Sequence, residues 1–155
     1  MLATKKDLGA ILRLQKTAFE AVAAEYGDWD MPPMTQTQDQ IESDYRDGYV
    51  FFKATDGQKI VGSIRGVLGQ DEVCKIAKLV VLPEYQKNGI GLTLIHEIEA
   101  YFSACKEYQI FTGDKSTHVI RMYEQLGYKA FKNERHSDYN IVHMRKLSKG
   151  SVPKL

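Results

Sequence analysis

The stretch that decides the fold is LVVLPEYQKNGIGLTLIHEIE, residues 79–99. It begins with an apolar run typical of a buried strand and continues through Pro83 to Gly89-Ile90-Gly91. Apolar residues then recur at helical spacing, which predicts a helix starting near Gly89. A glycine turn before a helix can aim bare backbone N–H groups at an anion, or it can be an ordinary tight connection.

Two common phosphate-binding motifs do not match this turn. The phosphate loop GxxxxGK[ST] requires a lysine after the glycine, whereas Leu92 and Thr93 follow Gly91. The dinucleotide fingerprint GxGxxG requires a third glycine where Leu94 stands, and it opens a βαβ unit instead of following a meander. Both motifs are therefore disfavoured.

The composition is that of an ordinary globular chain. Its 155 residues suit one domain with a core, and 21 basic against 20 acidic residues give a net charge of +1. Because a nucleic-acid-binding domain usually carries a basic excess, we expect no nucleic-acid partner. No apolar run approaches the ~18 residues of a membrane span, and the first residues lack a signal peptide's apolar core. Cys74 and Cys105 form no CxxC motif, which favours a reduced, cytoplasmic protein without disulfides.

The pattern predicts an α/β protein with a mixed sheet. The expected elements are helices at about 4–25, 38–47, 89–102 and 117–126 and strands at 49–54, 59–69, 73–82, 108–113, 128–134 and 140–147. Thr4 is expected to cap the first helix, and Thr35 or Thr37 the second, which ends at Gly48. The segment YGDWDMPPM, 26–34, is expected to be a loop. A helical crossover makes strands 73–82 and 108–113 parallel neighbours.

Two motifs in this order resemble a known family. The segment Val81–Gly91 fits V-x-P-x-x-[QR]-x-x-G-x-G, and RMYEQLGY at 121–128 fits a helix ending in LYExLGF. Together they resemble the GNAT superfamily of N-acetyltransferases over residues 2–147. The resemblance implies one GNAT-like acyl-CoA N-acyltransferase domain over 1–147 and a flexible tail at 148–155. It also implies a mostly antiparallel sheet, flanked by helices and splayed between the family's fourth and fifth strands, here 74–82 and 108–112.

The sequence departs from the family at two places. Only Met1–Ala3 precede Thr4, so the first edge strand of the family is shortened or absent. Ser116 stands where the family often has an asparagine, seven residues before Tyr123. A serine hydroxyl can still form one hydrogen bond with the coenzyme A arm.

The resemblance implies acetyl-CoA as the cosubstrate and no metal. N–H groups from Gln86 to Gly91 and the helix dipole would bind the pyrophosphate, beside the charge of Lys87. Gly89 and Gly91 would allow close approach of the backbone. Backbone groups of strand 79–81 would pair with the pantetheine amides, and the Val81 N–H would be an oxyanion donor. The expected contacts are Leu79, Val80, Val81, Gln86, Lys87, Asn88, Gly89, Ile90, Gly91, Leu92 and Ser116. A plain turn beside a buried strand is the alternative.

Tyr123 stands where the family's general acid stands. It would protonate the departing thiolate, although a tyrosine pKa of ~10 against a thiol pKa of ~8.5 makes full transfer uphill by ~2 kcal/mol. A hydrogen bond to the thiolate is therefore favoured over full transfer, and a core tyrosine is the alternative. Glu25 is the candidate general base, with a water chain as the alternative. Asp71 and Glu72 are expected to be solvated turn residues.

The remaining reactive residues give weaker signals. Asp28 and Asp30 flank Trp29, which could wall a pocket for a cation or anchor the loop. The acidic loop 25–30 weakly favours a cationic amine acceptor. His96, His118, His136 and His143 show no metal-ligand spacing. Both cysteines are expected to act as small apolar residues.

The sequence therefore predicts an N-acetyltransferase. It would move acetyl from acetyl-CoA directly to an amine of a small molecule or peptide through a ternary complex, because no positioned nucleophile is visible. A non-catalytic acyl-CoA-binding regulatory module is the first alternative, and a nucleotide-binding domain using the glycine turn is the second. A homodimer that pairs through the final hairpin is a further possibility.

Overall fold

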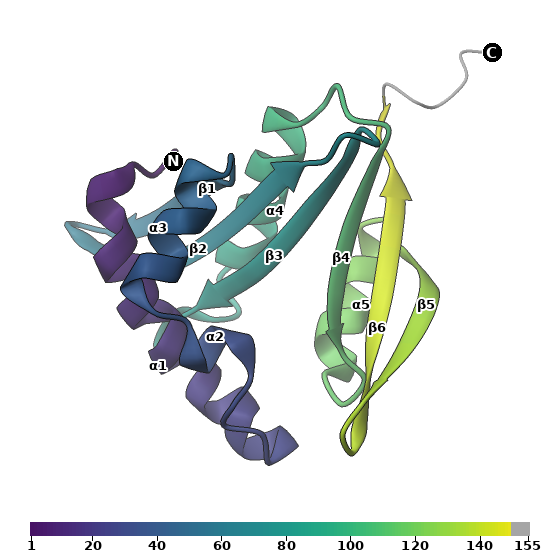
Figure 1. Ribbon diagram of the computed structural model, residues 1–155, viewed down its shortest axis with the longest axis horizontal. Coiled ribbons are helices and arrows are strands. Elements are labelled where there is room, and N and C mark those ends of the chain that lie inside the picture. The colour runs from purple at the N-terminus through teal and green to yellow at the C-terminus, as the bar shows by residue number, and fades with distance from the viewer. Residues whose placement is uncertain (150–155) are drawn as a thin grey trace. The chain divides into compact units, whose positions relative to one another are not determined.

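The computed structural model describes residues 1–149 and divides the chain into two compact parts. The first part comprises Met1–Val67 and Lys78–Tyr101, and the second comprises Leu68–Ala77 and the residues from Phe102 onward. Six strands form one mixed sheet in the order β1-β2-β3-β4-β6-β5 (Figure 1). The expected α/β class with a mixed sheet is confirmed.

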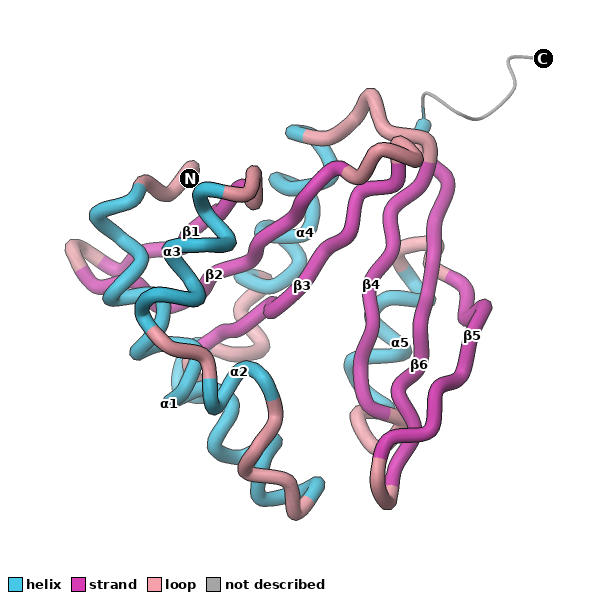
Figure 2. Tube along the Cα trace, in the orientation of Figure 1, coloured by secondary structure: helices cyan, strands magenta, loops and turns pink. Residues whose placement is uncertain are grey.

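Figure 2 shows the helices and strands of each part. The first part contains α1 (Leu8–Tyr26), α2 (Pro32–Thr35), α3 (Gln38–Arg46), β1 (Val50–Asp56), β2 (Lys59–Leu68) and α4 (Ile90–Tyr101). Two short 3-10 helices, Lys5–Asp7 and Pro83–Tyr85, also belong to it. Strand β3 (Val73–Val81) runs through both parts. The second part adds β4 (Glu107–Gly113), α5 (Thr117–Gln125), β5 (Lys129–His136) and β6 (Tyr139–Leu147).

The predicted cap is confirmed for α3 but is wrong for α1, which begins at Leu8 after Asp7, whereas Thr4 precedes the short 3-10 helix Lys5–Asp7. The Thr4 N–H donates to Asp7 Oδ2 at 2.8 Å. At α3, Thr37 Oγ1 accepts from the Gln40 N–H at 3.2 Å and Gln40 Oε1 accepts from the Thr37 N–H at 2.9 Å, a reciprocal capping box. Thr37, not Thr35, is therefore the cap. The helix ends at Arg46 with Asp47 as its C-cap, and Gly48 follows with a left-handed φ of 102°, so the predicted stop at this glycine is confirmed.

The loop prediction for 26–34 is wrong in part. Pro32 begins the single helical turn α2. A proline at the first helical position has a backbone angle suited to a helix and lacks the N–H that would go unpaired there. Two prolines in succession usually indicate a break between helices, whereas here they start a helical turn.

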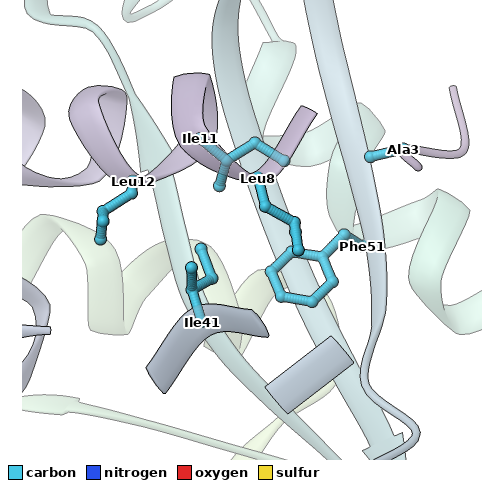
Figure 3. Packing of buried hydrophobic residues seen from close by; sticks show 6 residues of the cluster. All are labelled: Ala3, Leu8, Ile11, Leu12, Ile41 and Phe51. Atoms are coloured by element: carbon cyan, nitrogen blue, oxygen red, sulfur yellow. The ribbon is translucent and has the colours of Figure 1, made fainter. Parts of the chain in front are cut away.

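The core of the first part lies between α1, α3 and β1 (Figure 3). One cluster of it consists of Ala3, Leu8, Ile11, Leu12, Ile41 and Phe51, and a second of Leu14, Ala18, Val61, Val80 and Leu82. The next residue along β1, Phe52, points the other way, and its ring centroid lies 5.8 Å from that of Tyr101 on α4. Helices α1 and α3 therefore cover one face of this part of the sheet and α4 covers the opposite face (Figure 1). Leu94, Ile95 and Ile98 are fully buried, as the apolar stripe of α4 predicted.

The first edge strand is shortened, as the sequence predicted. Leu2 forms a single antiparallel bridge with Phe52. The Ala3 N–H donates to Phe51 O at 2.8 Å, and the Lys53 N–H donates to Met1 O at 2.7 Å. Three residues therefore extend the sheet beside β1.

Strand pairing in the second part follows the predicted topology. Parallel pairing joins Val73–Lys75 of β3 to Glu107–Gln109 of β4, at the start of both strands. Strand β6 then pairs antiparallel with both β4 and β5. The helical crossover and the closing hairpin are confirmed, and the divergence of β3 from β4 stays a prediction.

The end of the fold lies later than expected. Ser148 is fully buried, and its N–H donates to Lys106 O at 3.1 Å, so the tail prediction is wrong for this residue. Residues 150–155 of that predicted tail lie outside the described residues. Cys74 and Cys105 are buried and form no disulfide with each other, in keeping with small apolar residues. Within residues 1–149 no helix is both long and apolar enough to cross a membrane.

Candidate active site

The end of β3 presents backbone groups on the side away from β2. The Leu82 N–H donates to Val61 O of β2 at 2.9 Å. Because successive N–H groups of a strand point in opposite directions, the Val81 and Leu79 N–H groups point away from β2, whereas Val80 faces β2. The Val81 carbonyl already accepts from Gln86 Nε2 at 3.0 Å. Leu79 and Val81 are thus the two residues whose N–H groups are placed to pair with an added chain.

The glycine turn between β3 and α4 brings several N–H groups to the start of a helix. Lys87 and Gly89 are both left-handed, with φ of 66° and 79°. The Thr93 N–H donates to Gly89 O at 3.0 Å, which closes the first turn of α4. The N–H groups of Ile90, Gly91 and Leu92 come before this bond and have no intrahelical acceptor. They and the helix dipole form a place for an anion.

The two glycines of the turn have different reasons to be glycine. Gly89 needs its left-handed backbone, and a Cβ there would meet no atom within 4 Å. Gly91 has no such φ, and a Cβ there would lie 3.8 Å from Leu79 Cδ2 and 4.0 Å from Val81 Cγ2, ordinary contact distances. The chain itself therefore leaves room for a side chain at Gly91.

Tyr123 on α5 is buried, with 4% of its surface exposed. Its ring centroid lies 6.0 Å from that of Tyr128, and burial raises its pKa well above the ordinary value. Its hydroxyl has no hydrogen-bond partner among residues 1–149, although a buried tyrosine hydroxyl usually finds one. This hydroxyl stays protonated at neutral pH and remains able to donate to a bound group. Ser116 is buried at the start of the same helix, where its N–H donates to Gly113 O at 3.1 Å.

The acidic candidates are more exposed. Glu25 lies exposed near the end of α1 and has no ion pair within residues 1–149. Trp29 in the following loop is 55% exposed, so it does not anchor that loop by burial. Asp71 Oδ1 accepts from the Val73 N–H at 3.2 Å, and the Glu72 carboxylate pairs with Lys106 at 2.9 Å. Asp71 and Glu72 are thus exposed turn residues, as predicted.

Sequence reasoning missed a buried polar network around Arg65. Arg65 is 1% exposed and donates to Gln15 Oε1 at 2.6 Å, Asp44 Oδ2 at 2.9 Å and Gln36 Oε1 at 3.2 Å. Burial lowers the pKa of Arg65 to about 10, although Asp44 opposes the shift. Alternation gave no signal for it, because all residues from Val61 to Gly66 of β2 are buried.

The histidines remain dispersed. His96 is exposed, and His143 Nε2 lies 3.1 Å from Glu134 Oε1 on the neighbouring strand β5. This hydrogen bond is the main reason that the pKa of Glu134 is lowered. Residues 1–149 contain no group of three or more His, Cys, Asp or Glu side chains placed to hold a metal ion.

The β3–α4–β4 crossover, the glycine turn and the buried tyrosine are the features of an acyl-CoA-dependent acyltransferase. A sequence model of the acetyltransferase (GNAT) domain matches residues 22–148. The chain therefore belongs to the GNAT family of acetyltransferases. This membership supports acetyl transfer from an acyl-CoA cosubstrate.

Solved structures of similar fold include three acetyltransferases. The ribosomal-protein-S18-alanine N-acetyltransferase of Escherichia coli has a TM-score of 0.79 at 15% identity, over 95% of this chain and 91% of its own. PaiA N-acetyltransferase of Thermoplasma acidophilum, in complex with coenzyme A, gives 0.73 at 18% identity, over 94% and 95%. An aminoglycoside 6'-N-acetyltransferase complexed with coenzyme A gives 0.73 at 16% identity, over 100% and 99%. At these identities the likeness concerns the fold. No curated protein sequence matches the chain.

Proposed function

We propose that this protein transfers acetyl from acetyl-CoA directly to an amine of a small molecule or peptide, within a ternary complex. The observation that carries the proposal is the hydroxyl of the largely buried Tyr123, which has no hydrogen-bond partner among residues 1–149, in a chain of the GNAT family. The names of two structural neighbours give a ribosomal-protein alanine and an aminoglycoside as their acceptors, both of which are amines. These names support an amine acceptor in general.

The cosubstrate would be held mainly by backbone groups. The N–H groups of Ile90, Gly91 and Leu92 would bind the pyrophosphate, with Lys87 adding a positive charge. The pantetheine amides would pair with Leu79 and Val81 at the edge of β3. Gln86, Asn88, Gly89, Val80 and Ser116 complete the proposed set of contacts.

The proposed reaction needs two proton movements. The acceptor ammonium first loses a proton to Glu25 or to a water chain, and the free amine nitrogen then attacks the thioester carbonyl carbon. The Val81 N–H stabilises the oxyanion, the carbon–sulfur bond breaks, and the new amide nitrogen loses its second proton. The departing thiolate accepts a hydrogen bond from Tyr123 and takes up the proton that the amide nitrogen releases, so that it ends as the coenzyme A thiol.

Binding is tested by thermal unfolding with acetyl-CoA, coenzyme A and ATP. A ligand at ~100 times its dissociation constant adds ~2.7 kcal/mol of stability, which is a shift of several degrees for a domain of this size. We expect both coenzyme A species to raise the Tm and ATP to leave it unchanged. A shift with ATP alone would instead support a nucleotide-binding domain.

Catalysis is tested by amine-dependent release of the coenzyme A thiol. We expect release with at least one member of a panel of primary amines and peptides, and release that saturates in both substrates. Stabilisation by acetyl-CoA without release for any amine would favour the non-catalytic binding module. No stabilisation by any of the ligands would contradict both functions.

Gly91→Ala separates the stability of the chain from its affinity for the cosubstrate. Without ligand, we expect the variant to be more stable by up to about 1 kcal/mol, because alanine favours a helix and its Cβ meets no clash. If phosphates approach this backbone, the same Cβ should weaken coenzyme A binding by at least about tenfold. Urea unfolding and titration calorimetry measure the two effects.

Gly9→Ala is the matched control for this prediction. Gly9 also lies in a helix, and a Cβ there would make ordinary contacts of 3.6 Å to the Arg13 side chain and 3.8 Å to that of Gln38. We expect a similar gain in stability and unchanged affinity for coenzyme A. Equal affinities in both variants and the wild type would exclude close approach at Gly91.

A further inference from the structure

A cavity of about 380 Å³ lies beside α2 and α3, in the first part of the chain. Hydroxyl and amide side chains line it, including those of Thr35, Gln40 and Ser43. Two charged residues complete the lining, Asp44 from α3 and Lys78 from β3. The cavity thus presents hydroxyl, amide and charged groups, and it reaches the strand that leads to Val81.

The positive charge of Lys78 in this cavity is not paired with a negative charge of the described chain. Asp44 Oδ2 already accepts from Arg65 at 2.9 Å and from Gln36 Nε2 at 3.0 Å. The Lys78 ammonium has no hydrogen bond and no ion pair with any of residues 1–149. Burial lowers the pKa of Lys78, and the charge of Arg65 lowers it further while Asp44 raises it. Of the two cations that feel the charge of Asp44, only Arg65 therefore forms an ion pair with it.

The backbone holds Lys78 in this unfavourable place. Its φ of 51° is left-handed within β3, a conformation that costs a non-glycine residue on the order of 1 kcal/mol or more. Ile76 and Val80, two positions before and after it, are buried, and Lys78 itself is half-buried and lines the cavity. A partly buried cation without a counter-ion is costly unless a partner arrives. The missing partner is an anion.

We propose that Lys78 binds an anionic group of the acceptor, a carboxylate or a phosphate. The acetylated amine then belongs to a molecule that also carries a negative charge. This inference rests on the proposed function, because it places the acceptor three residues before Val81 along β3. The side-chain amide of Gln40, whose Oε1 accepts from the Thr37 N–H, would offer its NH2 group as a further donor to the same anion.

Pairs of amines that differ only in an anionic group test the inference. Ethanolamine is compared with phosphoethanolamine, and cadaverine with lysine, by thiol release. We expect kcat/KM to favour the anionic member of at least one pair by about tenfold or more, as for a hydrogen-bonded charge pair. The preferred pair distinguishes a phosphate from a carboxylate. Equal kcat/KM within both pairs would overturn the inference and leave the proposed function intact.

Three variants assign the preference to Lys78. Lys78→Met should abolish the preference by raising KM for the anionic acceptor, while KM for acetyl-CoA stays unchanged. Lys78→Arg should retain part of the preference. Lys75→Met, an exposed lysine on the same strand, is the control and should behave as wild type. A higher KM for acetyl-CoA in Lys78→Met would place the ammonium on the cosubstrate instead. Loss of kcat for every acceptor in both Lys78 variants would indicate proton transfer, and either result overturns the inference.

Binding gives a readout that needs no turnover. We expect inorganic phosphate or glutarate to raise the Tm of the wild type and of Lys75→Met, and to raise that of Lys78→Met less. Equal shifts in all three proteins would overturn the anion site. An absence of thiol release together with the expected shifts would overturn the proposed function and leave the anion site standing.

Discussion

Tyr123→Phe is expected to lower kcat by about two orders of magnitude, at the lower end of the range for general acids. Burial raises the pKa of Tyr123, which makes full proton transfer to a thiolate less favourable than for an exposed tyrosine. The hydroxyl therefore acts chiefly as a hydrogen-bond donor to the charge that develops on sulfur. Because that charge exists mainly in the transition state, KM for acetyl-CoA should change little. Steady-state thiol release measures both constants.

Tyr128→Phe is the control for this variant. Tyr128 is also a buried tyrosine, and its ring lies beside that of Tyr123. We expect its kcat to stay within severalfold of wild type. The Tm of Tyr123→Phe should not fall, since the hydroxyl it removes has no partner among residues 1–149. A kcat for Tyr123→Phe within threefold of wild type would exclude the tyrosine from the chemistry.

The same burial predicts a loss of stability in base. The unfolded chain releases the Tyr123 proton near pH 10, whereas the folded chain retains it because its pKa is raised. The unfolded state then binds fewer protons, so the contribution of Tyr123 is complete below pH ~10 and declines as the pH rises above it. Urea unfolding between pH 9 and pH 11 should show a smaller decline in Tyr123→Phe. An identical decline in both proteins would contradict the raised pKa.

Local patterns explain why the fold could be predicted from the sequence. Thr37 and Gln40 form a capping box that depends on residues three apart, and Gly89 meets the φ requirement of one turn. The crossover to β4 then follows from the order of elements, because a helix between strands leads to parallel pairing. Each of these three predictions depends only on residues or elements that are adjacent in the sequence.

The polar interior could not be predicted in the same way. Arg65 meets partners that lie 21 to 50 residues away, and their convergence depends on the packing of α1 and α3 over β2. For Lys78 the strand alternation did contain a signal, since a lysine in the phase of Ile76 and Val80 faces inward. Only the folded chain shows that its ammonium lacks a partner among residues 1–149. The alternation along a strand identifies an inward-facing lysine. Only the contacts of its ammonium in the folded chain show what that lysine can bind.

Asp44→Ala is expected to reduce the free energy of unfolding by about 3 kcal/mol or more. The change leaves the buried Arg65 guanidinium without its carboxylate, and removing one partner of a buried ion pair costs on the order of 3–5 kcal/mol. The partial exposure of Asp44, 27% of its side chain, places the expectation at the lower end. Asp47→Ala, an exposed aspartate just beyond the same helix, should change stability by less than about 0.5 kcal/mol.

A double-mutant cycle separates the ion pair from the packing around it. Arg65→Met with Asp44→Leu removes both charges, so the double variant should be less destabilised than the sum of the two single variants by at least about 1 kcal/mol. Full recovery is not expected, because Gln15 and Gln36 lose the donor they accept from. Additive losses would mean that the two charges do not depend on each other. In that case groups other than Asp44 would neutralise the charge of Arg65 near Lys78, and the cavity would not need an anion for that purpose.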